Sequence, residues 1–317
     1  MRVSAIWRLA GALAVMGVTV TACSASPAGS PAASPPGNGT HRARTPPATQ
    51  GAAGTSRPAT PSAATPSARA APPVAHVIVS RVRGADGSVV TVAAFRGPVQ
   101  YVLHNGSEDP GAAAAGLVKA GPAITGPERR HLLGAFNGGF KLSAGAGGYE
   151  QEGHVIAALR PGLASLVIDR SGQARIGIWG ASVPAPGEAV YSVRQNLQPL
   201  VYGGHPTSAA ADPGLWGATL GGGASVARSA VGQDSYGDLL YAGSISATPA
   251  DLAAALAARG ARIAMELDIN PEWVQLDIAP YAGGPLTAAV PGQNRPASQF
   301  LTGWIRDFFT VLAAPSS

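Results

Sequence analysis

Cysteine is nearly absent from this chain of 317 residues, because Cys23 is the single one. Disulfides within the chain, zinc sites built from cysteines and a cysteine nucleophile in the folded part are therefore excluded. Lysine is almost as scarce, since it occurs only at Lys119 and Lys141. Six of the 22 basic residues lie before residue 77, where there is no acid, so the remainder has 16 basic against 17 acidic residues. A nucleic-acid-binding domain would gather Lys and Arg on one face, so we expect no nucleic-acid partner.

The amino-terminal segment contains an apolar run that is too short to cross a bilayer. The run extends from Leu9 to Val20, follows two arginines and leads into Cys23. Residues 1–22 resemble a bacterial lipoprotein signal peptide, which implies cleavage before Cys23 and acylation of that residue. We therefore expect a protein held by a lipid anchor at the cell membrane, on its extracytoplasmic face. A plain secretory signal with an incidental cysteine is the alternative.

Residues 23–76 contain almost no large apolar side chains. After Cys23 the segment consists largely of Ala, Pro, Ser, Thr and Gly and shows no hydrophobic periodicity. Such a segment cannot bury enough apolar surface to fold. The sequence predicts a disordered tether here and a folded domain over residues 77–317.

Most of the folded part alternates between apolar and polar residues, which indicates strands separated by Gly, Pro and Asn. The residues Arg170-Ser171-Gly172 are typical of the turn of a hairpin. The sequence predicts an α+β fold, a single globular domain with a mixed, largely β sheet and a few packed helices. The strands are expected at residues 76–80, 89–93, 99–103, 165–169, 174–179 and 238–242.

Two segments carry helical signals. Between Thr248 and Gly260, a capping Thr precedes Pro at the first helical position and an acid in the first turn, and Gly ends the segment. This helix lies between the strand at 238–242 and a further strand at 262–270, which predicts a β-α-β unit with a parallel pair of strands. A second helix is expected over Ser298–Leu312, where the large apolar residues fall on one face.

The strand at 262–270, Arg-Ile-Ala-Met-Glu-Leu-Asp-Ile-Asn, places acids among apolar residues. Because side chains alternate along a strand, Glu266, Asp268 and Asn270 share one face. A face that meets water would explain one acid. Two acids and an amide in a row favour a site, because ligands gather beyond the carboxyl ends of strands in such units. The same oxygens could also bind a divalent cation such as Ca²⁺, and no other cofactor is expected.

Two further segments offer polar groups beside glycines. Asn137-Gly138-Gly139-Phe140 is either a hairpin turn or a place where the backbone approaches a ligand and the Asn amide binds it. Glu152 and His154 lie in a segment rich in glycine and acids. They are candidates for substrate binding, with an ordinary surface loop as the alternative.

The segment 228–232, Arg-Ser-Ala-Val-Gly, follows three glycines, but no Gly-Lys-Ser or Gly-Lys-Thr follows them. A phosphate loop is therefore not indicated. The guanidinium of Arg228 suits a phosphate or a carboxylate because it presents a planar, charged fork. A buried arginine that pairs with an acid of the domain is the alternative.

In this order, the segments resemble the motifs of the phosphodiester glycosidase family. Residues 137–140 are similar to its Asn-Gly-Gly-Phe, residues 228–232 to its Arg-Thr-Ala-Ile-Gly, and Leu267-Asp268 to the start of its Leu-Asp-Gly-Gly-Gly-Ser. The resemblance covers roughly residues 95–280 and departs from the family after Asp268, where Ile269-Asn270-Pro271 replaces glycines. The resemblance implies a hydrolase that acts on sugar-1-phosphodiester linkages. Because a lipoprotein is expected, we expect these linkages in envelope-related glycans.

On that resemblance we expect catalytic roles for Asp268, Glu266 and Arg228, in which a carboxylate supports an oxocarbenium-like transition state and a cation holds the phosphate. Substrate binding is expected from Asn137, Gly138, Gly139, Glu152, His154 and Asn270. The partner would be a glycan or a sugar phosphate. A non-catalytic, glycan-binding envelope lipoprotein is the alternative function, and the oligomeric state stays open.

Overall fold

The structure, a computed structural model, describes residues 74–315. These residues lie in one compact unit and form mostly strands with a few short helices, which confirms the α+β, single-domain prediction. The expected signal peptide, Cys23 and most of the tether lie outside the described residues. Within the described range, no helix is long and apolar enough to span a membrane.

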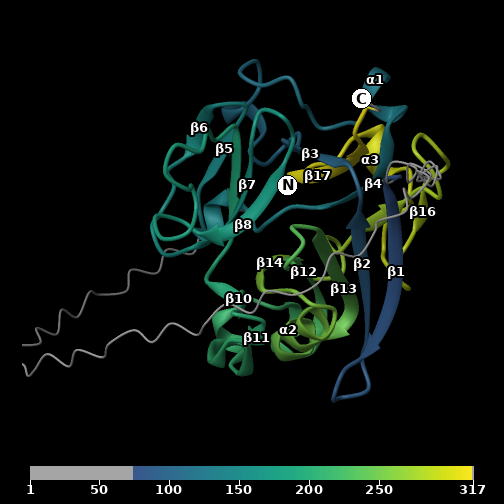
Figure 1. The fold of residues 1–317 in the computed structure, drawn as a ribbon. Helices are drawn as coiled ribbons and strands as arrows, with labels where there is room; N and C mark the ends of the chain where they lie inside the picture. Colours follow the sequence, from purple (N-terminus) through teal and green to yellow (C-terminus); the bar gives the residue numbers. More distant parts are fainter. Residues whose placement is uncertain (1–73, 316–317) are drawn as a thin grey trace, which may run out of the picture. The chain divides into compact units, whose positions relative to one another are not determined.

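Three sheets with antiparallel pairing carry the fold (Figure 1). The first sheet contains β1 (His76–Arg83), β2 (Val89–Arg96), β10 (Pro199–Tyr202), β11 (His205–Pro206), β12 (Val226–Gln233), β13 (Leu239–Ala247) and β14 (Ile263–Ile269). Their order across the sheet is β1-β2-β13-β12-β14-β10-β11.

The other two sheets have five strands each. The second contains β3 (Val99–His104), β4 (Leu132–Asn137), β15 (Leu276–Ile278), β16 (Thr287–Ala288) and β17 (Phe308–Ala313), in the order β16-β15-β4-β17-β3. The third contains β5 (Tyr149–Gln151), β6 (His154–Ala157), β7 (Ala164–Ile168), β8 (Ala174–Ile178) and β9 (Ser192–Gln195), in the order β6-β5-β9-β7-β8.

The predicted strands are confirmed, each to within a few residues at its ends. They correspond to β1, β2, β3, β7, β8 and β13. The predicted hairpin is also present, because β7 pairs with β8 across the turn that contains Arg170-Ser171-Gly172, with Ile168 opposite Ala174.

The main hydrophobic core lies where the three sheets meet. Phe136 of β4 is at its centre, with its ring 5.8 Å from that of Phe95, 5.4 Å from that of Tyr241 and 5.2 Å from that of Phe309. Strand β14 contributes to this core from one face and, through Ala264, to a second core on the other face of the first sheet. β14 is therefore buried on both faces, and the water-facing explanation of its acids is wrong.

Helix α2 (Pro249–Ala258) covers that second core and confirms the predicted helix (Figure 1). The side chain of Thr248 accepts a hydrogen bond from the backbone nitrogen of Asp251 at 3.2 Å, and the Asp251 carboxylate accepts one from the Thr248 nitrogen at 3.0 Å. This capping box fixes the start of the helix. The predicted β-α-β unit needs one correction: β13 and β14 run in the same direction, but β12 lies between them and pairs antiparallel with both.

The helix expected over Ser298–Leu312 is wrong. The segment divides into α3 (Gln299–Thr302) and β17, and the third α-helix of the described residues, α1, spans Gly126–Arg129. Gly303 has a φ of 127°, which ends α3 and turns the chain. β17 begins with aromatic and β-branched residues, Phe308–Val311, and pairs with β4 and β3 on either side, so tertiary pairing outweighs the helical spacing.

Candidate active site

The three motif segments meet around the hydroxyl of Ser229. This hydroxyl accepts a hydrogen bond from Nδ2 of Asn137 at 2.9 Å and donates one to the carbonyl of Asp268 at 2.7 Å. The backbone nitrogen of Asp268 in turn donates to the carbonyl of Gly138 at 2.9 Å. The end of β4, the middle of β12 and the end of β14 are thereby held together by direct bonds.

Arg228 and Glu266 form an ion pair that is completely buried. Nη1 of Arg228 lies 2.8 Å from Oε1 of Glu266 and also donates to the carbonyl of Trp216 at 3.0 Å. Burial raises the pKa of Glu266 to about 8, although Arg228 favours the charged form. Nε and Nη2 of Arg228 and Oε2 of Glu266 have no hydrogen-bond partner within residues 74–315. The structure thus shows the alternative in which a buried Arg228 pairs with an acid of the domain. Three polar atoms of this pair make no hydrogen bond within residues 74–315.

Asp268 lies at the end of β14 and reaches the solvent slightly, with 8% of its side chain exposed. Its Oδ2 is 3.0 Å from Nη2 of Arg306, and its Oδ1 accepts a hydrogen bond from the backbone nitrogen of Ile269 at 3.0 Å. Burial raises the pKa of Asp268 to about 7, against the opposing effect of Arg306. Asp268 is therefore a carboxylate that changes its charge near neutral pH beside a fixed cation.

Sequence reasoning missed the residues that surround Asp268. Arg306 also donates from Nη2 to the carbonyl of Gly139 at 3.1 Å, and its Nε lies 3.5 Å from Oδ2 of Asp109. The next residue, Asp307, forms a buried ion pair with Arg194, with 2.7 Å between Nε and Oδ2. The adjacent charges at 306 and 307 within an apolar segment were a signal, but the expected helix placed them on its outer face.

The glycines after Asn137 do not form a hairpin turn, because β4 pairs with β15 and β17 and not with the chain that follows it. They leave room for side chains of the protein itself. A Cβ at Gly138 would lie 2.0 Å from Oδ2 of Asp307, and one at Gly139 would lie 2.8 Å from Cζ of Arg194. The buried ion pair of Arg194 and Asp307 therefore requires both glycines.

The amide of Asn137 is fully used within the protein. Its Oδ1 accepts hydrogen bonds from the hydroxyl of Tyr241 at 3.0 Å and from the backbone nitrogen of Gln275 at 3.1 Å. Its Nδ2 donates to Ser229 and to the carbonyl of Gly138. The structure thus places Asn137 beneath the cluster, as the residue that joins the three segments.

Asn270 directs its side chain away from both carboxylates. Its Oδ1 accepts a hydrogen bond from the backbone nitrogen of Leu220 at 2.9 Å. Its φ of 75° is a left-handed conformation that glycine adopts freely and that Asn tolerates better than most residues. Within residues 74–315 no group of three or more His, Cys, Asp or Glu side chains is arranged to hold a metal ion. Glu266, Asp268 and Asn270 each face a different partner, which does not favour a shared cation.

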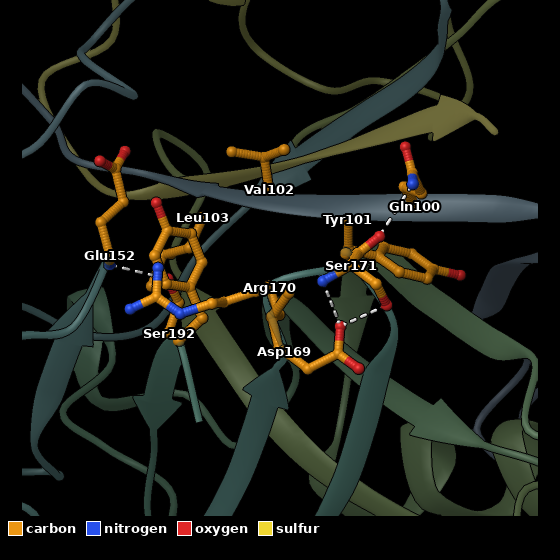
Figure 2. A pocket seen from close by; sticks show the side chains of 12 residues that line it. Gln100, Tyr101, Val102, Leu103, Glu152, Asp169, Arg170, Ser171 and Ser192 are labelled. Atoms are coloured by element: carbon orange, nitrogen blue, oxygen red, sulfur yellow. Dashed lines mark hydrogen bonds between the residues drawn. The ribbon is translucent and has the colours of Figure 1, made fainter. Parts of the chain in front are cut away.

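Glu152 and His154 lie apart from this cluster, at the turn between β5 and β6 of the third sheet and at the start of β6. Glu152 accepts hydrogen bonds from the backbone nitrogens of Lys119 at 2.9 Å and Ala120 at 2.8 Å. It lines a pocket of about 180 Å³, in which Arg170 lies over the ring of Tyr191 at 4.8 Å (Figure 2). His154 is exposed at the start of the edge strand β6. The structure brings neither residue to Asp268.

No family profile matches the chain, and no curated protein matches its sequence. Solved structures resemble it in fold. The catalytic domain of zebrafish N-acetylglucosamine-1-phosphodiester alpha-N-acetylglucosaminidase, auto-inhibited by its pro-peptide, superimposes with a TM-score of 0.49 at 16% identity, over 77% of this chain and 85% of that one. A protein from Synechocystis superimposes with a TM-score of 0.44 at 13% identity, over 77% of this chain and 64% of that one. A protein from Burkholderia pseudomallei that is described as exported gives 0.38 at 14% identity, over 71% and 74%. These are similarities of fold alone.

Proposed function

We propose that this protein is a hydrolase that cleaves a sugar-1-phosphodiester linkage in envelope-related glycans. The observation that carries the proposal is the meeting of residues 137–140, 228–232 and 267–268 through Ser229. These are the segments that resemble the motifs of phosphodiester glycosidases. Around them lie three buried carboxylates and three buried arginines, whose burial strengthens their electrostatic effect: Glu266, Asp268, Asp307, Arg194, Arg228 and Arg306.

In the proposed reaction, the bond between the anomeric carbon and the phosphate oxygen breaks. The electron pair of this bond leaves with the phosphate, so the leaving group needs a cation more than it needs a proton. The oxygen of a water molecule bonds to the anomeric carbon, and its proton passes to a carboxylate. The products are a free sugar and a phosphomonoester.

Asp268 suits the role of that carboxylate, because it reaches the solvent and its pKa lies near neutral pH. We assign the phosphate to Arg306, which contacts Asp268 directly. The sequence suggested Arg228 for this role, but Arg228 is completely buried, and its Nη1 is bonded to Glu266 and to the carbonyl of Trp216. The ion pair of Arg228 and Glu266 then sets the electrostatic field around Asp268. Asn137 holds the three segments in position through its hydrogen bonds.

The test is incubation of the full chain with a panel of sugar-1-phosphodiesters, with release of the free sugar as the measurement. Asp268→Asn keeps the shape of the side chain and should lower kcat by a factor of roughly 100 to 10,000. Asp277→Asn is a matched control, since Asp277 is also buried with a pKa raised to about 7 but its bonds go to Gln275 and Gln293. Turnover that survives Asp268→Asn would contradict the proposed mechanism.

A non-catalytic, glycan-binding role is the second candidate. One observation that favours it is the complete burial of Arg228 and Glu266. Another is that Asp268 lines none of three pockets formed by residues 74–315, of which the first is lined in part by Gln100, the second by Gly97 and the third by Ile78. Glycan binding by a chain that turns over none of the panel, with equal affinity in the Asp268→Asn variant, would support this role over the hydrolase.

Attachment to the membrane is part of the proposal. We expect a lipid on Cys23 to hold the protein at the extracytoplasmic face of the membrane. Cys23→Ser should move the protein from the membrane fraction to the soluble fraction without loss of turnover on soluble substrates. An unchanged distribution would mean that something other than Cys23 attaches it.

A further inference from the structure

One indole ring contacts both an arginine of the candidate site and a second arginine. The centroid of the Trp273 ring is 5.0 Å from the guanidinium carbon of Arg306, the residue that contacts Asp268. The guanidinium carbon of Arg295 is 5.9 Å from the same centroid. Both distances are typical of cation–π contacts, so one ring holds two cations, each within about 6 Å of its centre.

Three polar atoms without partners near this ring are hydrogen-bond donors, and the acceptors without partners in its neighbourhood, among the described residues, are Oδ2 of Asp268 and Oε1 of Gln275. Within residues 74–315 no hydrogen bond is made by Nε of Arg306, Nε of Arg295 or Nε1 of Trp304. Trp304 is 98% buried, and Arg295 lies over its ring at 5.6 Å. A buried donor without an acceptor is costly, and three donors in one place point to an anionic ligand.

The acids near these donors, Asp109 and Glu272, accept no hydrogen bond from them, so the donors can bind a ligand. Nε of Arg306 is 3.5 Å from Asp109, but the contact lacks the geometry of a hydrogen bond. Arg295 pairs with Glu272 at 3.0 Å, with 32% and 47% of the two side chains exposed. An exposed pair of this kind contributes little free energy, so an anionic ligand can displace Glu272.

We propose that Arg306, Trp273 and Arg295 form a leaving-group subsite that selects substrates in which a second phosphate follows the first. The inference rests on the proposed function and names its substrate class as glycosyl diphosphates. Arg306 binds the phosphate on the anomeric carbon, beside Asp268, and Arg295 binds the next phosphate. Trp273 holds the two guanidiniums in place. A diphosphate leaves with the electron pair of the broken bond, as in the single-phosphate reaction.

Kinetics on a matched pair of substrates test this selection. One substrate is a nucleoside diphosphate sugar, and the other is the methyl ester of the same sugar 1-phosphate. Arg295→Gln should lower kcat/KM for the diphosphate about tenfold or more and leave kcat/KM for the methyl ester within about twofold. Arg170→Gln is the control, because Arg170 also lies over an aromatic ring, Tyr191, outside the site.

A binding measurement separates the subsite from the reaction. By calorimetry, inorganic pyrophosphate should bind the full chain more tightly than orthophosphate, and Arg295→Gln should remove this preference, whereas Arg170→Gln should keep it. If Arg295→Gln loses the preference for pyrophosphate but the unmodified protein turns over no substrate, the subsite is supported and the proposed function is contradicted. Turnover with equal effects of Arg295→Gln on both substrates, or no preference in the unmodified protein, would overturn the subsite.

Discussion

Glu266 and Asp268 are two residues apart on one strand, yet their surroundings give them different properties. Glu266 is completely buried against Arg228, whereas Asp268 keeps a slight exposure and faces Arg306. Burial raises the pKa values of both, to about 8 and about 7. Asp268 is therefore the carboxylate that exchanges its proton with the solvent as the pH rises through the neutral range.

The dependence of turnover on pH follows from this difference. A carboxylate that receives a proton from water must be ionised, so kcat/KM should rise as the pH passes through about 7, the pKa of Asp268. The measurement is the pH profile of hydrolysis between pH 5 and 9 on a substrate that does not titrate there. A rate that falls through pH 7 would show that Asp268 acts as a general acid instead.

At the scale of elements, local signals predicted the helix and the strands well. The Thr-Pro start of α2 and the alternation of β1, β2 and β3 depend on neighbouring residues, so the sequence displays them directly. The segment that forms β17 has helical spacing, but its conformation is set by two strands that are distant in the chain. The helical propensity of a single segment carries no information about its pairing with distant strands.

The same reason explains which parts of the site were predictable. Asn137, Arg228 and Asp268 lie in segments with distinctive composition, and the structure places these segments together. Arg194 and Asp307 are more than a hundred residues apart. The charges at 306 and 307 were a local signal, but only the packing of three sheets brings Asp307 and Arg194 to the same glycines, so no local pattern could reveal that they form a pair.

The turn after β4 offers a direct test of this packing. Gly138→Ala should lower the free energy of unfolding by about 3 kcal/mol, because its Cβ would lie 2.0 Å from the buried carboxylate of Asp307. Gly121→Ala is the control, since a Cβ there meets nothing within 4 Å and its φ is not positive. Denaturant unfolding measures both. Equal stabilities of the two variants would mean that the turn can move away from Asp307.

The start of α2 offers a second test. Thr248→Ala removes the acceptor for the backbone nitrogen of Asp251 and should cost about 1 kcal/mol of unfolding free energy. Ser298→Ala is the matched control, because Ser298 precedes α3 but its side chain makes no capping bond. A loss in the Ser298 variant as large as that in the Thr248 variant would contradict the capping explanation.

At the scale of the whole molecule, buried acids set how stability depends on pH. Burial raises the pKa values of Glu266, Asp268 and Asp277 to about 8, 7 and 7. The folded state therefore keeps protons that the unfolded chain has released, and stability falls as the pH rises from about 4 through 8. This trend is opposite to that of carboxylates stabilised by ion pairs.

Asp277→Asn isolates one of these contributions. Its neighbours are the amides of Gln275 and Gln293, and the Gln275 amide can turn to accept a hydrogen bond from the new side chain. Relative to the unmodified protein, the variant should gain about 2 kcal/mol of unfolding free energy between pH 5 and pH 8. Urea unfolding at the two pH values measures the change. A difference that is constant across this range would exclude Asp277 as a source of the pH dependence.

The position of β17 in the middle of the second sheet has a consequence for how the chain is made. β3 and β4 do not pair with each other, and β17 joins them from a much later point in the sequence. During synthesis the amino-terminal strands emerge first and remain without this partner until Phe308–Ala313 has followed. The second sheet thus stays incomplete until Phe308–Ala313 has been made. This delay suits the leader predicted at residues 1–22, because a chain that is threaded through a translocation channel must stay unfolded until it has passed.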